Sequence, residues 1–137
     1  MDTQERVDTK TITAPWPWPD SLDAVIAAPQ YHELILENER VRVLDTRIPP
    51  GDIVPLHSHR WPALYYTIAA GDFVRRDSQG KVLFDSRSVP GLLTTSAATW
   101  MECLPPHSVE NVSGSEIHLV SVELKDGVLP PGVPSPK

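Results

Sequence analysis

Hydrophobic and polar residues alternate over short runs through most of the chain, and this period of two predicts β-strands rather than helices. A first strand carries His32, Leu34 and Leu36 on one face, and the next, RVRVLDTRI, is rich in β-branched residues. The sequence DSQG at 77–80 predicts a tight hairpin turn. After the first strand, the expected strands are 40–48, 53–59, 64–70, 72–76, 81–85, 92–95, 99–104 and 117–125. We therefore expect an all-β fold, which is an antiparallel sandwich, jelly roll or closed barrel.

Prolines gather at the two ends of the chain and leave room for one short helix at most. Asp20 or Ser21 is expected to cap a helix that runs to Ala28 and stops at Pro29. The preceding WPWP segment is expected to be extended, with its tryptophans packed on the barrel or on a second copy of the chain. The expected organisation is an N-terminal arm and short helix at 1–28, mobile over 1–14, a barrel at 29–126 and a Pro-rich tail at 127–137.

Composition excludes several classes of partner. The chain has 137 residues, of which 40% are hydrophobic and 22% charged, as in one ordinary globular domain. Its formal net charge of -6 argues against nucleic acid or an anionic membrane surface as a partner. No apolar run could span a bilayer, the N-terminus has no secretory pattern, and Cys103 is the only cysteine, so no internal disulfide forms. A cytoplasmic location is expected.

His57 and His59 form an H-x-H pair on an expected strand. Side chains two apart point the same way and are separated by roughly 7 Å, so two imidazoles can lean toward one metal ion. Ile53 and Pro55 share that face, which predicts that the pair lies on the apolar side of the strand. The alternatives are two histidines hydrogen-bonded in the core, or a coincidence at the surface.

The surroundings of the pair resemble the motifs of the cupin family. The first motif, a glycine followed by H-x-H and a second glycine, is matched by GDIVPLHSHRWPALYYTIAAG from Gly51 to Gly71. The second motif is matched in part by PPHSVEN, in which His107 and Asn111 stand at the family's spacing. The resemblance covers about residues 31–125. It implies a conical antiparallel barrel with His57, His59 and His107 inside as metal ligands.

The chain departs from the cupin pattern at three positions. Leu64 stands where the family carries a glutamate ligand, and Glu102 and Leu104 replace the usual proline and glycine of the second motif. The turn before His107 is then expected to be set by Pro105 and Pro106. Loss of the carboxylate implies a three-histidine site, as in iron-dependent dioxygenases of the family. Such a site keeps the full charge of a divalent ion and leaves open positions; Fe2+ is favoured, with Zn2+, Mn2+ or Ni2+ as alternatives.

Glu102 is the first candidate for a catalytic residue. On the expected strand it shares a face with Trp100 and Leu104, five residues before His107. It could be a fourth ligand, or a hydrogen-bond acceptor that orients a ligand imidazole. It could equally face solvent or pair with an inward arginine such as Arg42 or Arg60.

Alternation places Tyr66 on the cavity wall, which makes it the second catalytic candidate. His32 and His118 could line the cavity, although buried structural histidines are the more common case. Cys103 is expected to be a small buried hydrophobic residue. Asn111 is expected to bond backbone at a turn.

The sequence supports two main functional hypotheses. The first is a metal-dependent enzyme acting on a small molecule, either an iron dioxygenase or, with zinc or manganese, an isomerase or hydrolase. The second is a cupin that binds a small molecule without catalysis, because the fold does not decide between them. A barrel without metal is a third possibility, because Leu64 replaces the carboxylate ligand. A homodimer is expected, formed through an edge strand or an exchanged N-terminal arm.

Overall fold

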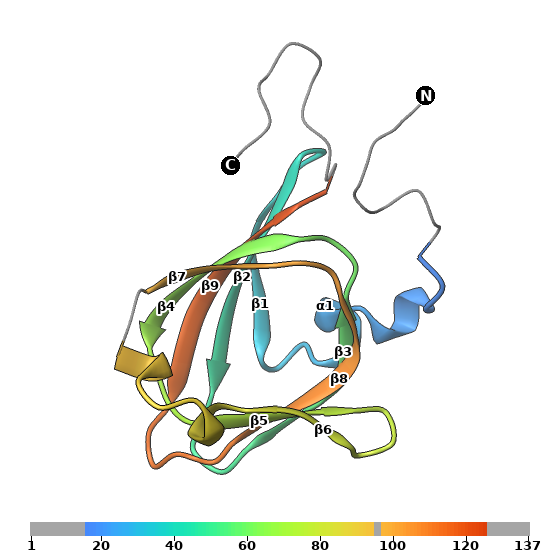
Figure 1. The fold of residues 1–137 in the computed structure, drawn as a ribbon. Helices are drawn as coiled ribbons and strands as arrows, with labels where there is room; N and C mark the ends of the chain where they lie inside the picture. The colour runs from blue at the N-terminus through green and yellow to red at the C-terminus, as the bar shows by residue number, and fades with distance from the viewer. Residues whose placement is uncertain (1–15, 95–96, 126–137) are drawn as a thin grey trace, which may run out of the picture.

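The computed structural model describes residues 16–94 and 97–125 and consists mainly of antiparallel strands (Figure 1). The expected mobile residues 1–14 and the Pro-rich tail lie outside the described residues. The strands are β1 (His32–Glu37), β2 (Val41–Ile48), β3 (Ile53–His59), β4 (Ala63–Ala69), β5 (Phe73–Asp77), β6 (Val82–Asp85), β7 (Ala98–Met101), β8 (Leu104–Asn111) and β9 (Ile117–Leu124). The helical segments are the 3-10 helices η1 (Asp20–Leu22), η2 (Ser86–Ser88) and η3 (Leu92–Thr94) and the helix α1 (Ala24–Ala27).

The strands form two sheets that face each other. One has the order β1-β2-β9-β4-β7 and the other the order β3-β8-β5-β6. Figure 1 shows how the two sheets curve around a common interior, with α1 lying beside β3. This arrangement confirms the expected antiparallel barrel of the jelly-roll type. No helix in the described part of the chain is long and apolar enough to cross a membrane.

Two segments differ from their expected secondary structure. Residues 92–95 were expected to form a strand, but Leu92–Thr94 is a 3-10 helix that follows a turn at Gly91, whose φ is +84°. The turn expected at Pro105 and Pro106 is part of β8. Both prolines fit there because β5 pairs with β8 only from His107 onward, and because the pairing of β8 with β3 is irregular at this point. No regular ladder therefore needs the N–H groups that the prolines lack.

The N-terminal helix is shorter than expected and is capped by a different residue. Asp23, rather than Asp20 or Ser21, accepts a hydrogen bond from the backbone N–H of Val25 at 3.3 Å. Asp20 and Ser21 belong instead to the 3-10 helix η1. Upstream, the rings of Trp16 and Trp18 pack against each other with their centroids 4.7 Å apart, and both are half-buried.

The strand β4 presents its expected inner face to the outside. Leu64, Tyr66 and Ile68 are exposed by 43%, 53% and 54%, whereas Ala63 is buried and Tyr65 is half-buried. Alternation was therefore predicted correctly, but the face was not. Tyr66 cannot be the cavity-wall residue, because it points away from the interior, and Leu64 cannot occupy the position of a metal ligand.

The core and two motif glycines hold the barrel together near the site. Buried apolar side chains form one cluster, and two of the glycines that match the cupin pattern are required by the backbone or by close packing. Gly51 has a φ of +83°, which side-chain-bearing residues rarely adopt, and a Cβ on Gly71 would collide with Ser113. The core cluster comprises Ala28, Ile48, Val54 and Ile117, with Tyr31, Phe73, Val109 and Leu119 packed against it.

Candidate metal centre

Four buried histidines from both sheets meet inside the barrel. His57 and His59 come from β3, His107 from β8, and His32 from β1 in the opposite sheet. The ring of His107 lies 4.4 Å from that of His57 and 5.6 Å from that of His59, measured between centroids. The rings of His57 and His59 are 5.0 Å apart. Each of the four residues is at most 6% exposed. The expected convergence of His57, His59 and His107 is thus present in the fold.

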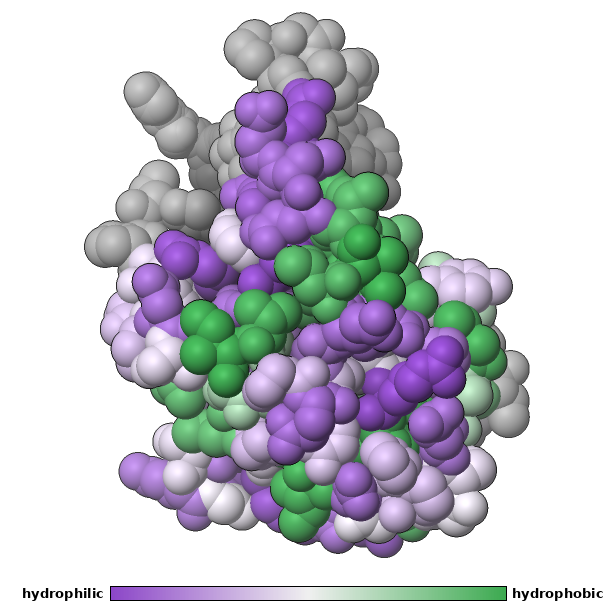
Figure 2. Space-filling model, turned by 180° about the vertical axis from the view of Figure 1, so that it is seen from behind, coloured by the Kyte–Doolittle hydropathy of each residue, from purple (hydrophilic) through white to green (hydrophobic). Residues whose placement is uncertain are grey.

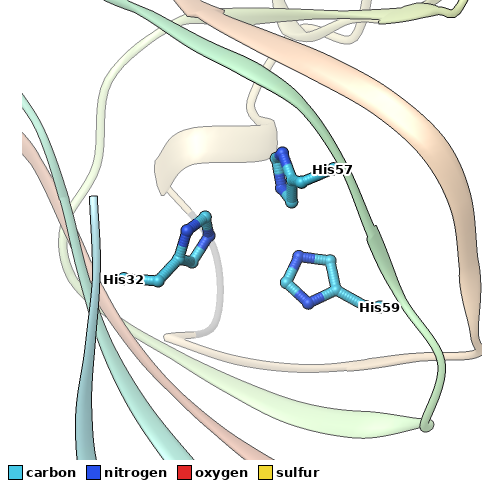
Figure 3. A group of neighbouring side chains, drawn as sticks. All are labelled: His32, His57 and His59. Carbon is cyan, nitrogen blue, oxygen red and sulfur yellow. The ribbon is translucent and has the colours of Figure 1, made fainter. Parts of the chain in front are cut away.

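His32 completes this group from the other side of the interior. Its ring lies 4.8 Å from that of His57 and 5.6 Å from that of His59. One ligand nitrogen from each of these three residues lies within 4.8 Å of the other two, and Figure 3 shows their rings turned toward a shared space. The sequence allowed His32 a place in the cavity but favoured a structural role. The structure places it among the side chains able to hold a metal ion.

A β-bulge turns the histidines of β3 inward. The pairing of β3 with β8 shifts register between Val54 and His57 and again before His59. Ile53 and Pro55 consequently face outward, with Ile53 exposed by 53%, although the sequence placed them on the same face as the histidines. The expectation that Ile53 and Pro55 mark the inner face was wrong, because a bulge interrupts the alternation on which it relied.

Three of the four imidazoles donate their Nδ1 proton to a backbone carbonyl oxygen. A carbonyl oxygen can only accept, so these rings carry hydrogen on Nδ1 and a lone pair on Nε2. Each therefore has Nε2 available as a metal ligand, with its orientation held from behind. The bonds are His32 to Ala28 O at 3.0 Å, His57 to Pro55 O at 2.8 Å and His107 to Pro105 O at 2.7 Å.

The fourth imidazole is oriented by a buried carboxylate. Nδ1 of His59 donates to Oε2 of Glu123 at 3.1 Å, and Glu123, on β9, is completely buried. Its other oxygen accepts from Nε of Arg42 at 2.6 Å, and Arg42 in turn donates to Asp23 at 2.8 Å. A metal-ligating histidine backed by a carboxylate is a common arrangement in proteins. Glu123 therefore supplies the orienting role that was considered for Glu102.

The environment keeps three of the histidines neutral: His32, His57 and His107. Burial, followed by the neighbouring charge of His59, lowers the pKa of His32 to about 4 and that of His107 to about 3. Burial and the adjacent His107 lower the pKa of His57 further. Neutral imidazole is the form that binds a metal ion. The tautomers and the burial of these side chains fit a divalent ion, and the ligand nitrogens of His32, His57 and His59 also have a suitable spacing.

Glu102 lies away from this centre. It is exposed and accepts a hydrogen bond at 2.7 Å from the indole Nε1 of Trp100. The prediction that Glu102 lies beside the ion was wrong, because the face of β7 that it shares with Trp100 is the outer one, where Trp100 pairs with the exposed Leu64. The solvent-facing alternative is the one that the structure shows.

The histidines border a cavity of about 730 Å3, a size suited to a small organic molecule. The polar lining includes Tyr65 and Arg75, neither of which was identified from the sequence as a site residue. Burial, followed by the charge of Glu123, raises the pKa of Tyr65 well above its usual value, so its hydroxyl stays protonated. No carboxylate lines the cavity among the described residues. The apolar lining includes Ile48, Val54, Phe73, Phe84, Val109 and Leu119.

The remaining candidates have structural roles. Asn111 is fully buried and donates to the backbone oxygens of Ile48 and Ser115, both at 2.8 Å, which confirms its expected bonding to backbone. His118 is hydrogen-bonded to Asp45 at 2.6 Å and does not line the cavity. Cys103 is only half-buried, and its thiol lies 3.1 Å from the backbone oxygen of Arg60.

Comparison with known proteins identifies the class of fold. No protein-family model matches the sequence, and no curated protein does. Among solved structures, a cupin domain from Bordetella pertussis is similar at 26% identity, with a TM-score of 0.55, covering 69% of this chain and 91% of that one. An RmlC-like cupin with a double-stranded β-helix fold from Methanocaldococcus jannaschii is 12% identical, with a TM-score of 0.49, covering 68% and 77%. The chain has the cupin fold, and its histidine cluster fits a cupin metal site.

Proposed function

We propose that this cupin is a metal-dependent enzyme, a mononuclear non-haem iron dioxygenase that acts on a small molecule. The observation that carries the proposal is the set of buried imidazoles, each fixed through Nδ1 so that Nε2 remains available. His57 and His59 would hold the ion together with His107, His32 or both. Bound Fe2+ would supply open positions for substrate and dioxygen.

The protein's own residues support oxygen chemistry more than hydrolysis or isomerisation. A hydrolase or isomerase needs a general base near the substrate, and no carboxylate lines the cavity in the described part of the chain. Glu123 is engaged with Arg42 and His59, and Tyr65 has too high a pKa to act as a base at neutral pH. Tyr65 can instead donate a hydrogen bond to a bound ligand, and the apolar walls exclude water from it.

Oxygen uptake with metal-substituted protein tests the proposal. Protein loaded with Fe2+ is expected to consume dioxygen in the presence of a thiol or a diketone, whereas protein loaded with Zn2+ is not. His57→Ala is expected to lose both metal binding and oxygen uptake. Turnover that is equal with zinc and independent of oxygen would favour an isomerase or hydrolase. Tight metal and ligand binding with no turnover would favour a non-catalytic binding protein.

We also propose that the chain forms a homodimer through the outer face of the five-stranded sheet. An apolar row crosses all five strands there, because Leu36 pairs with Val43, Val43 with Val122, Val122 with Leu64, and Leu64 with Trp100. Hydrophobic side chains also gather on the rear of the molecule, below its hydrophilic upper end (Figure 2). A contiguous exposed apolar surface is typical of an interface. A cytoplasmic location is part of this proposal and is supported by the single cysteine.

A further inference from the structure

Arg75 is a cation in the cavity wall without a protein counter-ion. Its Nε is shielded from solvent and has no hydrogen-bond partner, and no salt bridge joins its guanidinium to any described residue. The guanidinium lies over the rings of Phe73 and Phe84, 5.7 and 5.9 Å from their centroids. These contacts hold its orientation but do not neutralise its charge.

Leaving this charge unpaired is costly, since burial without a counter-ion removes favourable hydration. The same loss of hydration lowers the pKa of Arg75 from its usual value. The adjacent Arg76 has the opposite situation, because it points outward and pairs with Glu110 at 2.9 Å. Two neighbouring arginines of one strand thus differ in that only the inner one lacks a partner.

Arg75 is also placed within reach of the histidines. On β5 it pairs with Val109 of β8, and His107 lies two residues along that strand on the same face. Such diagonal neighbours are roughly 7–8 Å apart. Tyr65, whose ring lies 6.3 Å from that of His59, lines the same cavity, and its hydroxyl forms no hydrogen bond with the described residues. A small molecule can therefore contact these donors and the metal site together.

We propose that Arg75 binds the carboxylate of a small organic acid, which is the substrate class of this site. A guanidinium fork matches a carboxylate in geometry, and the Tyr65 hydroxyl can donate to the same group. The apolar lining suits the body of an organic acid better than an inorganic anion. That the bound acid is a substrate rests on the proposed function, whereas the binding of a carboxylate by Arg75 does not depend on the metal.

Calorimetric titration of metal-free protein tests the inference separately from catalysis. The probes are hexanoate, benzoate, neutral benzamide and inorganic phosphate. Benzoate or hexanoate is expected to bind at least tenfold more tightly than benzamide and phosphate. Arg75→Met is expected to weaken that binding by 10- to 100-fold, and the matched control Arg76→Met by less than twofold. Arg75→Gln, with the same expected loss, replaces Arg75→Met if that variant does not fold.

Thermal unfolding without ligand gives a second measurement. Arg75→Met is expected to be at least as stable as the wild type, since it removes an unpaired, partly buried charge. The inference is overturned if no carboxylate binds, if benzamide or phosphate binds as tightly as the acids, or if binding survives the loss of Arg75. Because oxygen uptake is not measured, a failed dioxygenase assay leaves this result intact, and a failed titration leaves the metal site intact.

Discussion

Removal of the buried carboxylate of Glu123 is expected to weaken both the fold and the metal site. In Glu123→Gln the side chain keeps its size but loses its charge. Arg42 and His59 now donate to different oxygens of the carboxylate, and in the neutral amide an N–H2 group, which cannot accept, replaces one of these oxygens. One of these buried donors is then left facing the amide N–H2 group.

The size of the effect follows from the burial of this network. Breaking one partner of a buried ion pair costs about 3–5 kcal/mol in the free energy of unfolding. Arg42 retains Asp23 as a second carboxylate partner, which places the expected loss near 3 kcal/mol. If His59 is the donor that loses its acceptor, its Nδ1 proton is no longer fixed, and the affinity for a divalent metal is expected to fall by about 10- to 100-fold.

Glu110→Gln is the matched control. Glu110 also pairs with an arginine, Arg76, at 2.9 Å, but both side chains are about one-third exposed. An ion pair of this kind contributes about 1 kcal/mol or less. Urea unfolding of the metal-free variants at neutral pH measures the first effect, and competition with a chelator for Zn2+ measures the second. Equal losses of stability in the two variants would refute the argument from burial. A large loss of stability with unchanged zinc affinity would refute the role of Glu123 in orienting His59.

Three further predictions follow from the site and the surface. The pKa values of His32 and His107 lie at about 4 and 3 in the folded protein and near 6.5 in the unfolded chain, so the unfolded chain binds more protons between those limits. The stability of the metal-free protein should therefore fall as the pH drops below 6.5, by about 1.4 kcal/mol per pH unit for each histidine. Unfolding curves that do not change between pH 7 and pH 4.5 would contradict this. His32→Ala and His107→Ala should each lower zinc affinity by at least tenfold if both residues are ligands, and a variant with wild-type affinity in chelator competition identifies the residue that is not. If the proposed dimer forms, Leu64→Lys should convert it to a monomer in light scattering, whereas the control Val82→Lys on β6, at a site 49% exposed, should leave it intact. A monomeric wild type would exclude the interface.

The sequence predicted the fold better than it predicted the direction of individual side chains. The H-x-H pair and the hairpin at 77–80 are sequence-local signals, and His107 is marked by the resemblance to the second cupin motif; all three features are present in the structure. The errors concern which face of a strand points inward. The faces of β4 and β7 that carry Tyr66 and Glu102 point outward, and the bulge in β3 turns Pro55 away from the side of the histidines. Neither an apolar outer face nor a bulge leaves a clear signal in one sequence.

Arg75 and Glu123 were missed for a different reason. Neither was identified from the sequence, because a charged residue that alternates with apolar ones along a strand usually faces solvent. In the second half of β9 the inner residues are Ser121 and Glu123, which are fully buried, while Val122 is only half-buried on the outer face. A signal did exist, because each buried imidazole requires an acceptor for its second nitrogen, and Glu123 is the charged residue of β9 that could supply one.

The inverted polarity of β4 and β9 links the interior site to the exterior surface. Burying Glu123 while exposing Leu64 is unfavourable for an isolated barrel, since the hydrophobic effect drives the opposite arrangement. Each half of the inversion has a specific compensation. Inside, the carboxylate is neutralised by Arg42 and holds His59, so its burial is tied to a ligand site. Outside, Leu64 continues an apolar row across the whole sheet, which a second copy of the chain would cover. Metal binding and dimer formation are therefore expected to stabilise the same two strands, from opposite faces.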